Sequence, residues 1–241
     1  MRDRAEAALL PDLRRRRLQP ELMDDPELEA GPHLRALDAL RTVNLLSGTA
    51  GRLWREILSM EPRGRPLRVL DLACGGGDVA IAVKRRADAA GLPVEIHGCD
   101  RSGVALERAR RDAEARATRV DFFQADVVSG PLPDGYDLLC SSLFLHHLAR
   151  PAAVAFLARM GEAAGAVFVQ DLRRTAAGYA LAFLTLHTVA RSDVARVDGL
   201  RSVAGAFTLG EAEELARDAG LRGARLRGCW PQRFALSWRR A

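Results

Sequence analysis

One short segment restricts the possible folds of this chain more than any other feature. Residues 69–78 read VLDLACGGGD, an apolar run that passes directly into a glycine-rich turn, and a helical pattern starts at residue 79. Glycines in such a turn allow left-handed backbone conformations and let the backbone approach a ligand closely. The segment therefore predicts a buried strand, a ligand-binding turn and a helix in immediate succession.

From residue 64 onwards the chain alternates short apolar runs with helical stretches, which is typical of βαβ units and a mainly parallel sheet. A chain of 241 residues can form one α/β domain of this kind with additional helices. The predicted strands are residues 68–72, 94–99, 120–124, 137–140, 166–170, 224–229 and 234–238, and helices are predicted over 79–90, 103–116, 151–163 and 211–219. Because no helix separates the last two strands, we expect this seven-stranded sheet to end in a C-terminal antiparallel hairpin.

Residues 1–60 are predicted to form an N-terminal helical cap, with residues 61–241 as the sheet-containing domain. The cap would consist of a first amphipathic piece, a helix over 33–46 and further turns around Trp54. The arginine run at 14–17 is interpreted as a solvated helix end.

A second extra segment, about 175–207, lies between the fifth strand and the last helix and is too long for a simple connector. Within it, residues 179–187 are apolar on nearly every side of a helix, so protein, ligand or a partner chain must cover this helix. We expect the segment and the cap to form a lid over a substrate pocket, with Leu184 facing that pocket. Packing on the cap, or a homodimer contact, is the alternative.

Composition restricts the possible binding partners of the protein and its cellular compartment. The net charge is +5 and the pI about 9.5, but Lys84 is the only lysine, so the arginine excess indicates codon bias rather than nucleic-acid binding. The four cysteines form no CxxC pair, which favours reduced thiols in the cytoplasm. The longest apolar stretch, 179–190, is too short to cross a bilayer, and the charged first residues exclude a signal peptide. We therefore expect a cytoplasmic protein that acts on a small molecule, without nucleic acid or stable membrane insertion.

The carboxylate in the glycine-rich segment distinguishes between two ligand classes. The glycines alone also fit the dinucleotide-binding pattern, with Ala80 in the last position. Asp71, however, stands four residues before Gly75, where it can reach the amino-acid end of a ligand through an ammonium group or a bridging water. A dinucleotide would place its anionic pyrophosphate here, which a nearby carboxylate opposes, whereas a cationic sulfonium ligand with an ammonium group meets no such opposition.

The segment resembles motif I of class I S-adenosylmethionine-dependent methyltransferases, acidic-x-Gly-x-Gly-x-Gly, with Ala73 in place of the first glycine. This resemblance implies a Rossmann-like sheet and S-adenosylmethionine as the cofactor. At the ends of the next two strands, Asp100 would accept the ribose hydroxyls and Asp126 would meet the adenine amino group, unless Asp126 only caps its loop. The expected cofactor-binding residues are Asp71, Ala73, Cys74, Gly75, Gly77, Asp100, Arg101, Asp126, Val127 and Ser141.

The residues expected to act on the acceptor follow the fourth and fifth strands. His146 and His147 come after one and Asp171 ends the other, so a histidine oriented by a carboxylate could remove the proton of a hydroxyl group. Alternatively, the histidine pair only packs the start of a helix. Ser141 and Leu172 stand where catechol-type enzymes place metal-binding residues, so we expect no metal.

Further segments of the chain resemble ubiquinone/menaquinone-type and natural-product, polyketide-associated small-molecule O-methyltransferases. Among them are the histidine pair and residues 171–174. The resemblance implies methylation of a hydroxyl on a phenolic, polyketide-like molecule. C-methylation of a quinone-type precursor and a catalytically silent, cofactor-binding regulatory protein remain as alternatives.

Overall fold

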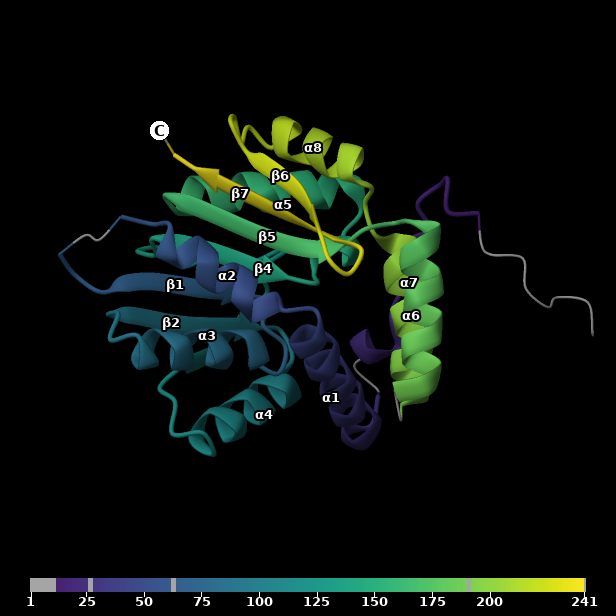
Figure 1. Ribbon diagram of the computed structural model, residues 1–241, viewed down its shortest axis with the longest axis horizontal. Coiled ribbons are helices and arrows are strands. Elements are labelled where there is room, and N and C mark those ends of the chain that lie inside the picture. Colours follow the sequence, from purple (N-terminus) through teal and green to yellow (C-terminus); the bar gives the residue numbers. More distant parts are fainter. Residues whose placement is uncertain (1–11, 26–27, 62–63, 190–191, 241) are drawn as a thin grey trace, which may run out of the picture.

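A seven-stranded sheet forms the centre of the protein, whose computed structural model describes residues 12–25, 28–61, 64–189 and 192–240 (Figure 1). The strand order is β3-β2-β1-β4-β5-β7-β6, with β7 antiparallel to β5 and to β6 and the other neighbours parallel. The strands are β1 (Leu67–Leu72), β2 (Val94–Asp100), β3 (Asp121–Gln124), β4 (Leu138–Ser142), β5 (Ala166–Leu172), β6 (Arg225–Cys229) and β7 (Arg233–Arg239). The predicted Rossmann-like sheet and its C-terminal hairpin are confirmed.

Helices occupy most of the segments between the strands. They are α1 (Ala30–Leu46), α2 (Thr49–Leu58), α3 (Asp78–Ala89), α4 (Gly103–Glu114), α5 (Arg150–Ala163), α6 (Ala176–Val189), α7 (Asp193–Gly205) and α8 (Leu209–Asp218), with 3₁₀ turns η1 (Leu22–Asp24) and η2 (Leu145–His147). A capping box begins α8, because Thr208 and Glu211 bond each other's backbone N–H groups. No helix in the described part of the chain is long and apolar enough to cross a membrane.

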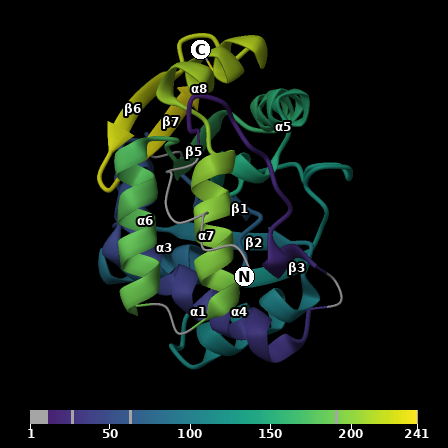
Figure 2. The same cartoon turned by 90° about the vertical axis from the view of Figure 1, so that its right-hand side faces the viewer.

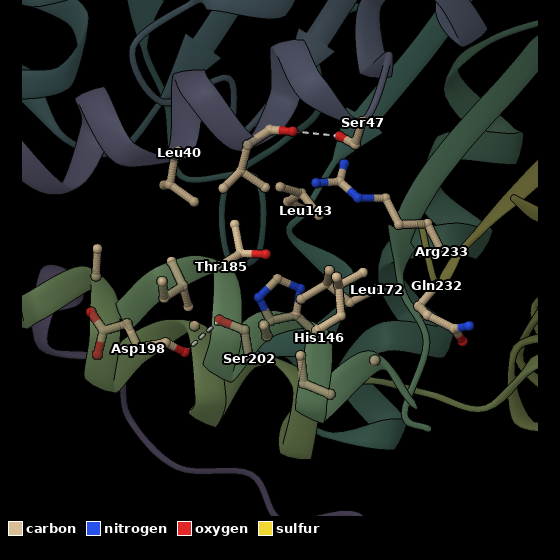
Figure 3. Close-up of a pocket in the computed structure, with 18 of the residues that line it drawn as sticks. Leu40, Ser47, Leu143, His146, Leu172, Thr185, Asp198, Ser202, Gln232 and Arg233 are labelled. Atoms are coloured by element: carbon tan, nitrogen blue, oxygen red, sulfur yellow. Dashed lines mark hydrogen bonds between the residues drawn. The ribbon is translucent and has the colours of Figure 1, made fainter. Parts of the chain in front are cut away.

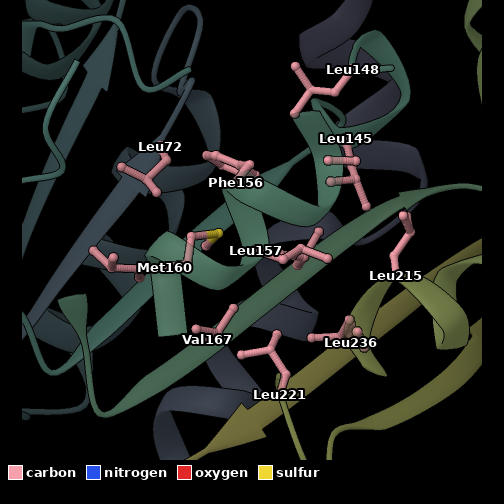
Figure 4. Close-up of a cluster of buried hydrophobic side chains, with 14 of the residues drawn as sticks. Leu72, Leu145, Leu148, Phe156, Leu157, Met160, Val167, Leu215, Leu221 and Leu236 are labelled. Carbon is pink, nitrogen blue, oxygen red and sulfur yellow. The ribbon is translucent and has the colours of Figure 1, made fainter. Parts of the chain in front are cut away.

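The two faces of the sheet carry separate hydrophobic cores. Successive strand residues point to opposite faces, so that Val69 joins the core under α2, α3 and α4, and Leu70 the core under α5 and α8. Figure 4 shows the second core, in which Phe156, Leu157 and Met160 of α5 meet strand residues. Because both faces are covered, ligands can reach the sheet only at its edges or strand ends.

Three helices lie beyond the carboxyl ends of the parallel strands. α6 and α7 pack side by side, and α1 packs against α7 (Figures 1 and 2). The prediction of an apolar helix over 179–187 is confirmed as part of α6, but Leu184 is 62% exposed and faces away from the interior. The expectation that Leu184 faces a pocket is therefore wrong.

The described residues before α1 differ from the prediction. Residues 12–25, here called the N-terminal strap, contain no α-helix, while residues 1–11 lie outside the described part. The strap is fixed by tertiary contacts instead: the Arg17 N–H donates to Ala204 O at 3.0 Å, and the Leu22 and Met23 N–H groups donate to the Asp198 carboxylate at 2.7 and 2.9 Å.

The arginine run is not a helix end, although Arg14, Arg15 and Arg17 are exposed to solvent as predicted. The guanidinium of Arg16 lies 3.9 Å from the ring centroid of Phe207 and donates to the carbonyls of Gly205 and His146. Hydrogen bonds to α7 and η2 thus take the place of the helical hydrogen bonds that the local sequence pattern predicts.

Candidate functional site

The glycine-rich turn joins β1 to α3 and contains two glycines with different roles. Gly77 has φ +69°, and a Cβ there would lie 2.6 Å from Cζ of Phe122, so this position is closed by packing. Gly75 has φ +52°, and a Cβ there would meet only Cδ2 of Leu37 at 3.8 Å. The turn is therefore open on the Gly75 side, under α1, which is where a ligand can approach the backbone.

Ala73 occupies this turn with φ +55°, a left-handed conformation that costs a residue with a Cβ about 1 kcal/mol. We expect Ala73→Gly to raise the free energy of unfolding by about 0.5–1 kcal/mol, as measured by urea denaturation. Ala82→Gly, in the interior of α3, is the matched control and should lower it by about 1 kcal/mol. Destabilisation by both substitutions would contradict the presence of strain at Ala73.

Asp100 ends β2 beside this turn. Its Oδ2 accepts the Gly75 N–H at 2.8 Å and its Oδ1 accepts the Ser102 N–H at 2.8 Å. A carboxylate offers about four lone-pair sites, so two remain for further donors, which fits the two hydroxyls of a ribose. Arg101 follows on the exposed side, where its carbonyl accepts a hydrogen bond from Gln124. The residues present therefore fit the expected cofactor at this strand end.

Asp71 is less accessible than the sequence analysis expected. It is 2% exposed, and its Oδ1 lies 3.7 Å from Sγ of Cys140. Burial, reinforced by the charge of Asp78, raises the pKa of Asp71 to about 8. Cys74 is half-buried beside it, and burial also raises the pKa of its thiol. All four cysteines are free thiols, as predicted.

The remaining predicted cofactor residues lie at neighbouring strand ends. Asp126 caps its own loop, because its carboxylate accepts the N–H groups of Val128 and Ser129 and the Ser129 hydroxyl. This is the alternative considered from sequence, and contact with an adenine ring stays a prediction. Val127 is 5% exposed and packs in the core, and the Ser141 hydroxyl donates to Leu72 O at 3.0 Å.

The sequence predicts that Asp171 orients one of two histidines, His147 or His146, and in the structure its partner is the buried His146. His146 Nδ1 donates to Asp171 Oδ1 at 2.6 Å, and the His146 backbone N–H donates to Oδ2 at 2.9 Å. Burial would lower the pKa of His146, but its ion pairs with Asp171 and with Glu21 outweigh this and raise the pKa to about 10. At neutral pH His146 is therefore a cation between two carboxylates.

Glu21 is a site residue that the sequence analysis missed. It comes from the N-terminal strap, is 8% exposed, and its Oε1 lies 3.4 Å from His146 Nε2 and accepts the Ser202 hydroxyl at 2.5 Å. Its Oε2 lies 3.8 Å from Nε2 of His147, which is the more accessible histidine. Residues 21–24 are among the segments that resemble the polyketide-associated methyltransferases, but the sequence assigns Glu21 no role, because its partners are more than a hundred residues away in the chain.

Glu21, His146 and His147 also form a group that could hold a metal ion, since one ligand atom from each lies within 4.8 Å of the others. The contacts to Asp171 and Ser202 already account for the positions of His146 and Glu21. The absence of a metal therefore stays a prediction.

These residues form one wall of a cavity of about 280 Å³ (Figure 3). The remaining walls come from α1, α6, α7, the residues after β4 and β5, and the β6–β7 turn, and most of them are apolar, including Leu40, Val43, Leu143, Leu172 and Leu186. A mainly apolar cavity with a few convergent polar groups is typical of a small-molecule site.

Comparison with known proteins identifies the central part of the chain. Residues 69–164 match the family described as "Methyltransferase domain". A demethylmenaquinone methyltransferase of Thermus thermophilus is 42% identical over 92 residues, which are 38% of this chain and 40% of that protein. A ubiquinone biosynthesis O-methyltransferase of Methylococcus capsulatus is 30% identical over 156 residues, 64% of this chain and 62% of that protein. The chain thus matches less than two thirds of the length of these relatives.

Solved structures share the fold at low sequence identity. The mitomycin 7-O-methyltransferase MmcR superposes with a TM-score of 0.59 at 23% identity, covering 83% of this chain and 54% of that one. Magnesium protoporphyrin IX methyltransferase of Synechocystis, with bound SAH, superposes with a TM-score of 0.54 at 15% identity. The match covers 88% of this chain and 84% of that one.

Proposed function

We propose that this chain, whose residues 69–164 match a methyltransferase domain, uses S-adenosylmethionine to methylate a hydroxyl group of a small, largely apolar, phenolic or polyketide-like molecule. The observation that carries this proposal is the histidine–carboxylate cluster in the wall of an apolar cavity at the ends of β4 and β5. A hydroxyl acceptor needs a group that removes its proton, and a cavity of this composition suits an aromatic ring.

The cluster assigns different tasks to the two histidines. The bound cofactor supplies an electrophilic methyl group. His147 accepts the hydroxyl proton of the acceptor, and Glu21, 3.8 Å from Nε2, stabilises the resulting imidazolium. His146 holds its proton at Nδ1 against Asp171, and its positive charge keeps the pKa of Glu21 low despite burial. His146 and Asp171 are therefore positioning residues, and His147 is the catalytic base in this proposal.

At the cofactor site, we propose the roles expected from sequence for Asp71, Asp100 and the open turn at Gly75. The Asp100 carboxylate has acceptor sites left for ribose hydroxyls, and Asp71 gains a counter-charge when an ammonium group is bound nearby. Asp126 and Val127 are proposed to border the adenine.

C-methylation of a quinone-type precursor is the second candidate, because the Thermus relative is named a demethylmenaquinone methyltransferase. Incubation with labelled S-adenosylmethionine and a panel of phenols and hydroxyquinones, followed by ether cleavage of the products, separates the two. An O-methyl group is lost and a C-methyl group survives. If the protein binds the cofactor but methylates none of the acceptors, the alternative of a catalytically silent regulatory protein is favoured. If methyl transfer persists after a metal chelator is added, this supports a mechanism without metal.

We propose that the cap (residues 1–60) and the insertion (about 175–207) form a lid over the acceptor, because both contribute walls of the cavity. Thr185 of α6 faces this cavity (Figure 3). Its neighbour Leu184 is exposed and does not line the cavity. Covering by a second copy of the chain remains the alternative for the exposed side of α6.

Thr185→Trp should fill part of the cavity and lower kcat/KM for bulky acceptors about 10-fold or more relative to small ones, with cofactor affinity unchanged. Leu184→Trp is the matched control and should leave acceptor preference unchanged. Steady-state kinetics on acceptors of graded size test this, and unaltered selectivity in folded Thr185→Trp would leave the insertion with a packing role only.

A further inference from the structure

Two buried arginines lie where β7 and α2 meet the cavity. Arg233, the first residue of β7, is 1% exposed and lines the cavity, and Arg52 of α2 is 5% exposed behind it. In Figure 3 the guanidinium group of Arg233 points toward Ser47 and Leu143, into the cavity. Both side chains are therefore removed from bulk water while one of them faces the space where a ligand would bind.

Among the described residues, the hydrogen-bond partners of these two guanidinium groups are all neutral. Arg233 Nη1 donates to the Thr49 hydroxyl at 2.8 Å. Arg52 donates to Gln170 Oε1 at 2.9 Å and to the carbonyls of Ser47 and Trp230 at 2.6 and 3.1 Å. These bonds join α2 to β5 and to the β6–β7 turn, so a structural role accounts for Nη1 of Arg233 and for Nε and Nη1 of Arg52.

This structural role leaves one nitrogen of each guanidinium group unexplained. Nη2 of Arg233 and Nη2 of Arg52 are buried and have no hydrogen-bond partner among the described residues, and neither arginine forms an ion pair with a described carboxylate. Burial, followed by the charge of Arg52, lowers the pKa of Arg233 to about 10, although the charges of Asp171 and Asp78 oppose this shift. A buried charge is costly unless it is paired, so two adjacent unpaired cations need an anion.

The carboxylates that border the cavity cannot serve as this anion because they are engaged elsewhere. Glu21 is held by His146 and Ser202, and Asp198 accepts two backbone N–H groups of the N-terminal strap. Asp171 and Asp78 act on Arg233 through their charges, but Asp171 is bonded to His146 and Asp78 to Asn44. A partner that contacts Nη2 would therefore come with the ligand.

We propose that the acceptor molecule carries an ionised carboxylate and that Nη2 of Arg233 binds it, with the charge of Arg52 adding to the attraction. This inference rests on the proposed function and names the acceptor more narrowly as an aromatic hydroxy acid. β5 and β7 lie on the opposite side of β4 from β1, β2 and β3, whose ends carry the predicted cofactor residues. Arg233 thus belongs to the acceptor side of the site. An ionised carboxylate matches the planar donor group of arginine.

The test measures binding, so that its result does not depend on turnover. Full-length protein saturated with S-adenosylhomocysteine is titrated calorimetrically at pH 7 with 4-hydroxybenzoate and with 4-hydroxybenzamide, which differ in charge but hardly in shape. We expect the protein to bind the benzoate about 10-fold or more tightly than the amide. Arg233→Met should abolish this preference, Arg233→Lys should restore part of it, and Arg227→Met, which removes an exposed arginine from the same hairpin, should leave it unchanged.

Three results would overturn the proposal. The first is equal binding of the two probes, or of neither, by the unsubstituted protein. The second is a preference that survives Arg233→Met. The third is a large loss of S-adenosylhomocysteine affinity in Arg233→Met and Arg233→Lys without a change in probe preference, because Arg233 would then bind the carboxylate of the cofactor. Arg233→Met should fold, since it removes an unpaired buried charge, and thermal unfolding verifies this. If labelled methyl transfer fails while the preference is present, only the proposed function is contradicted.

Discussion

Replacing His147 with alanine is expected to lower methyl-transfer turnover by about 10²–10⁴-fold, which is the range of general base catalysis. The affinity for S-adenosylmethionine should remain nearly unchanged, because His147 lies in the acceptor cavity and not at the glycine-rich turn. Single-turnover kinetics with saturating cofactor measure the first quantity and calorimetry the second. His187→Ala, on the exposed side of α6, is the matched control and should retain full activity.

His146 should respond differently, because it is expected to act through stability and position. Its pKa is raised from 6.5 in the unfolded chain to about 10 in the folded protein. A raised folded-state pKa stabilises the protein fully below about pH 6.5, and this contribution is lost as the pH rises through about 10. His146→Gln should therefore flatten the fall in thermal stability between these pH values. Full activity in His147→Ala, together with a 10²-fold or larger loss in a folded His146→Gln, would reverse the two assignments.

Removing the carboxylate of Asp100 should have the second largest effect. We expect Asp100→Ala to weaken S-adenosylmethionine binding by about 30- to 150-fold, or about 2–3 kcal/mol, because two charge-assisted hydrogen bonds to the ribose are lost. Calorimetry measures this. Asp121→Ala removes a carboxylate whose side chain is 92% exposed, at the other end of the adjacent strand, and should bind the cofactor normally.

Asp100 also accepts the Gly75 and Ser102 N–H groups, so its removal could loosen the turn itself. Asp100→Asn separates the two roles, because the amide keeps one acceptor oxygen for the backbone but loses the charge. An unchanged affinity in both variants, or tighter binding of NAD than of S-adenosylmethionine, would show that Asp100 does not hold the ribose of this cofactor.

The sequence alone determined the sheet and the glycine-rich turn. Strands are recognised by alternating or continuous apolar runs, and helices by apolar residues that recur about every 3.6 positions. A glycine-rich turn needs glycine at particular positions. Each of these features can therefore be read from a short stretch of neighbouring residues. The positions of Asp100, His146 and Asp171 followed as well, because the ends of parallel strands meet at one edge of a sheet. A contact between Asp171 and one of the two histidines could be anticipated in this way, but not that His146 would be the partner.

Only the tertiary structure decided which groups complete the site. Glu21 reaches the histidines because the N-terminal strap is hydrogen-bonded along α7, and the same bonds replace the helix that the local pattern favoured. Arg233 and Arg52 are buried cations only because α2 packs over β5 and β7. Leu184 and Thr185 are adjacent in an apolar helix whose pattern does not distinguish its inner from its outer side. Such contacts join residues far apart in the chain, and their partners have no signature in the neighbouring sequence, so the packing of whole elements decides them.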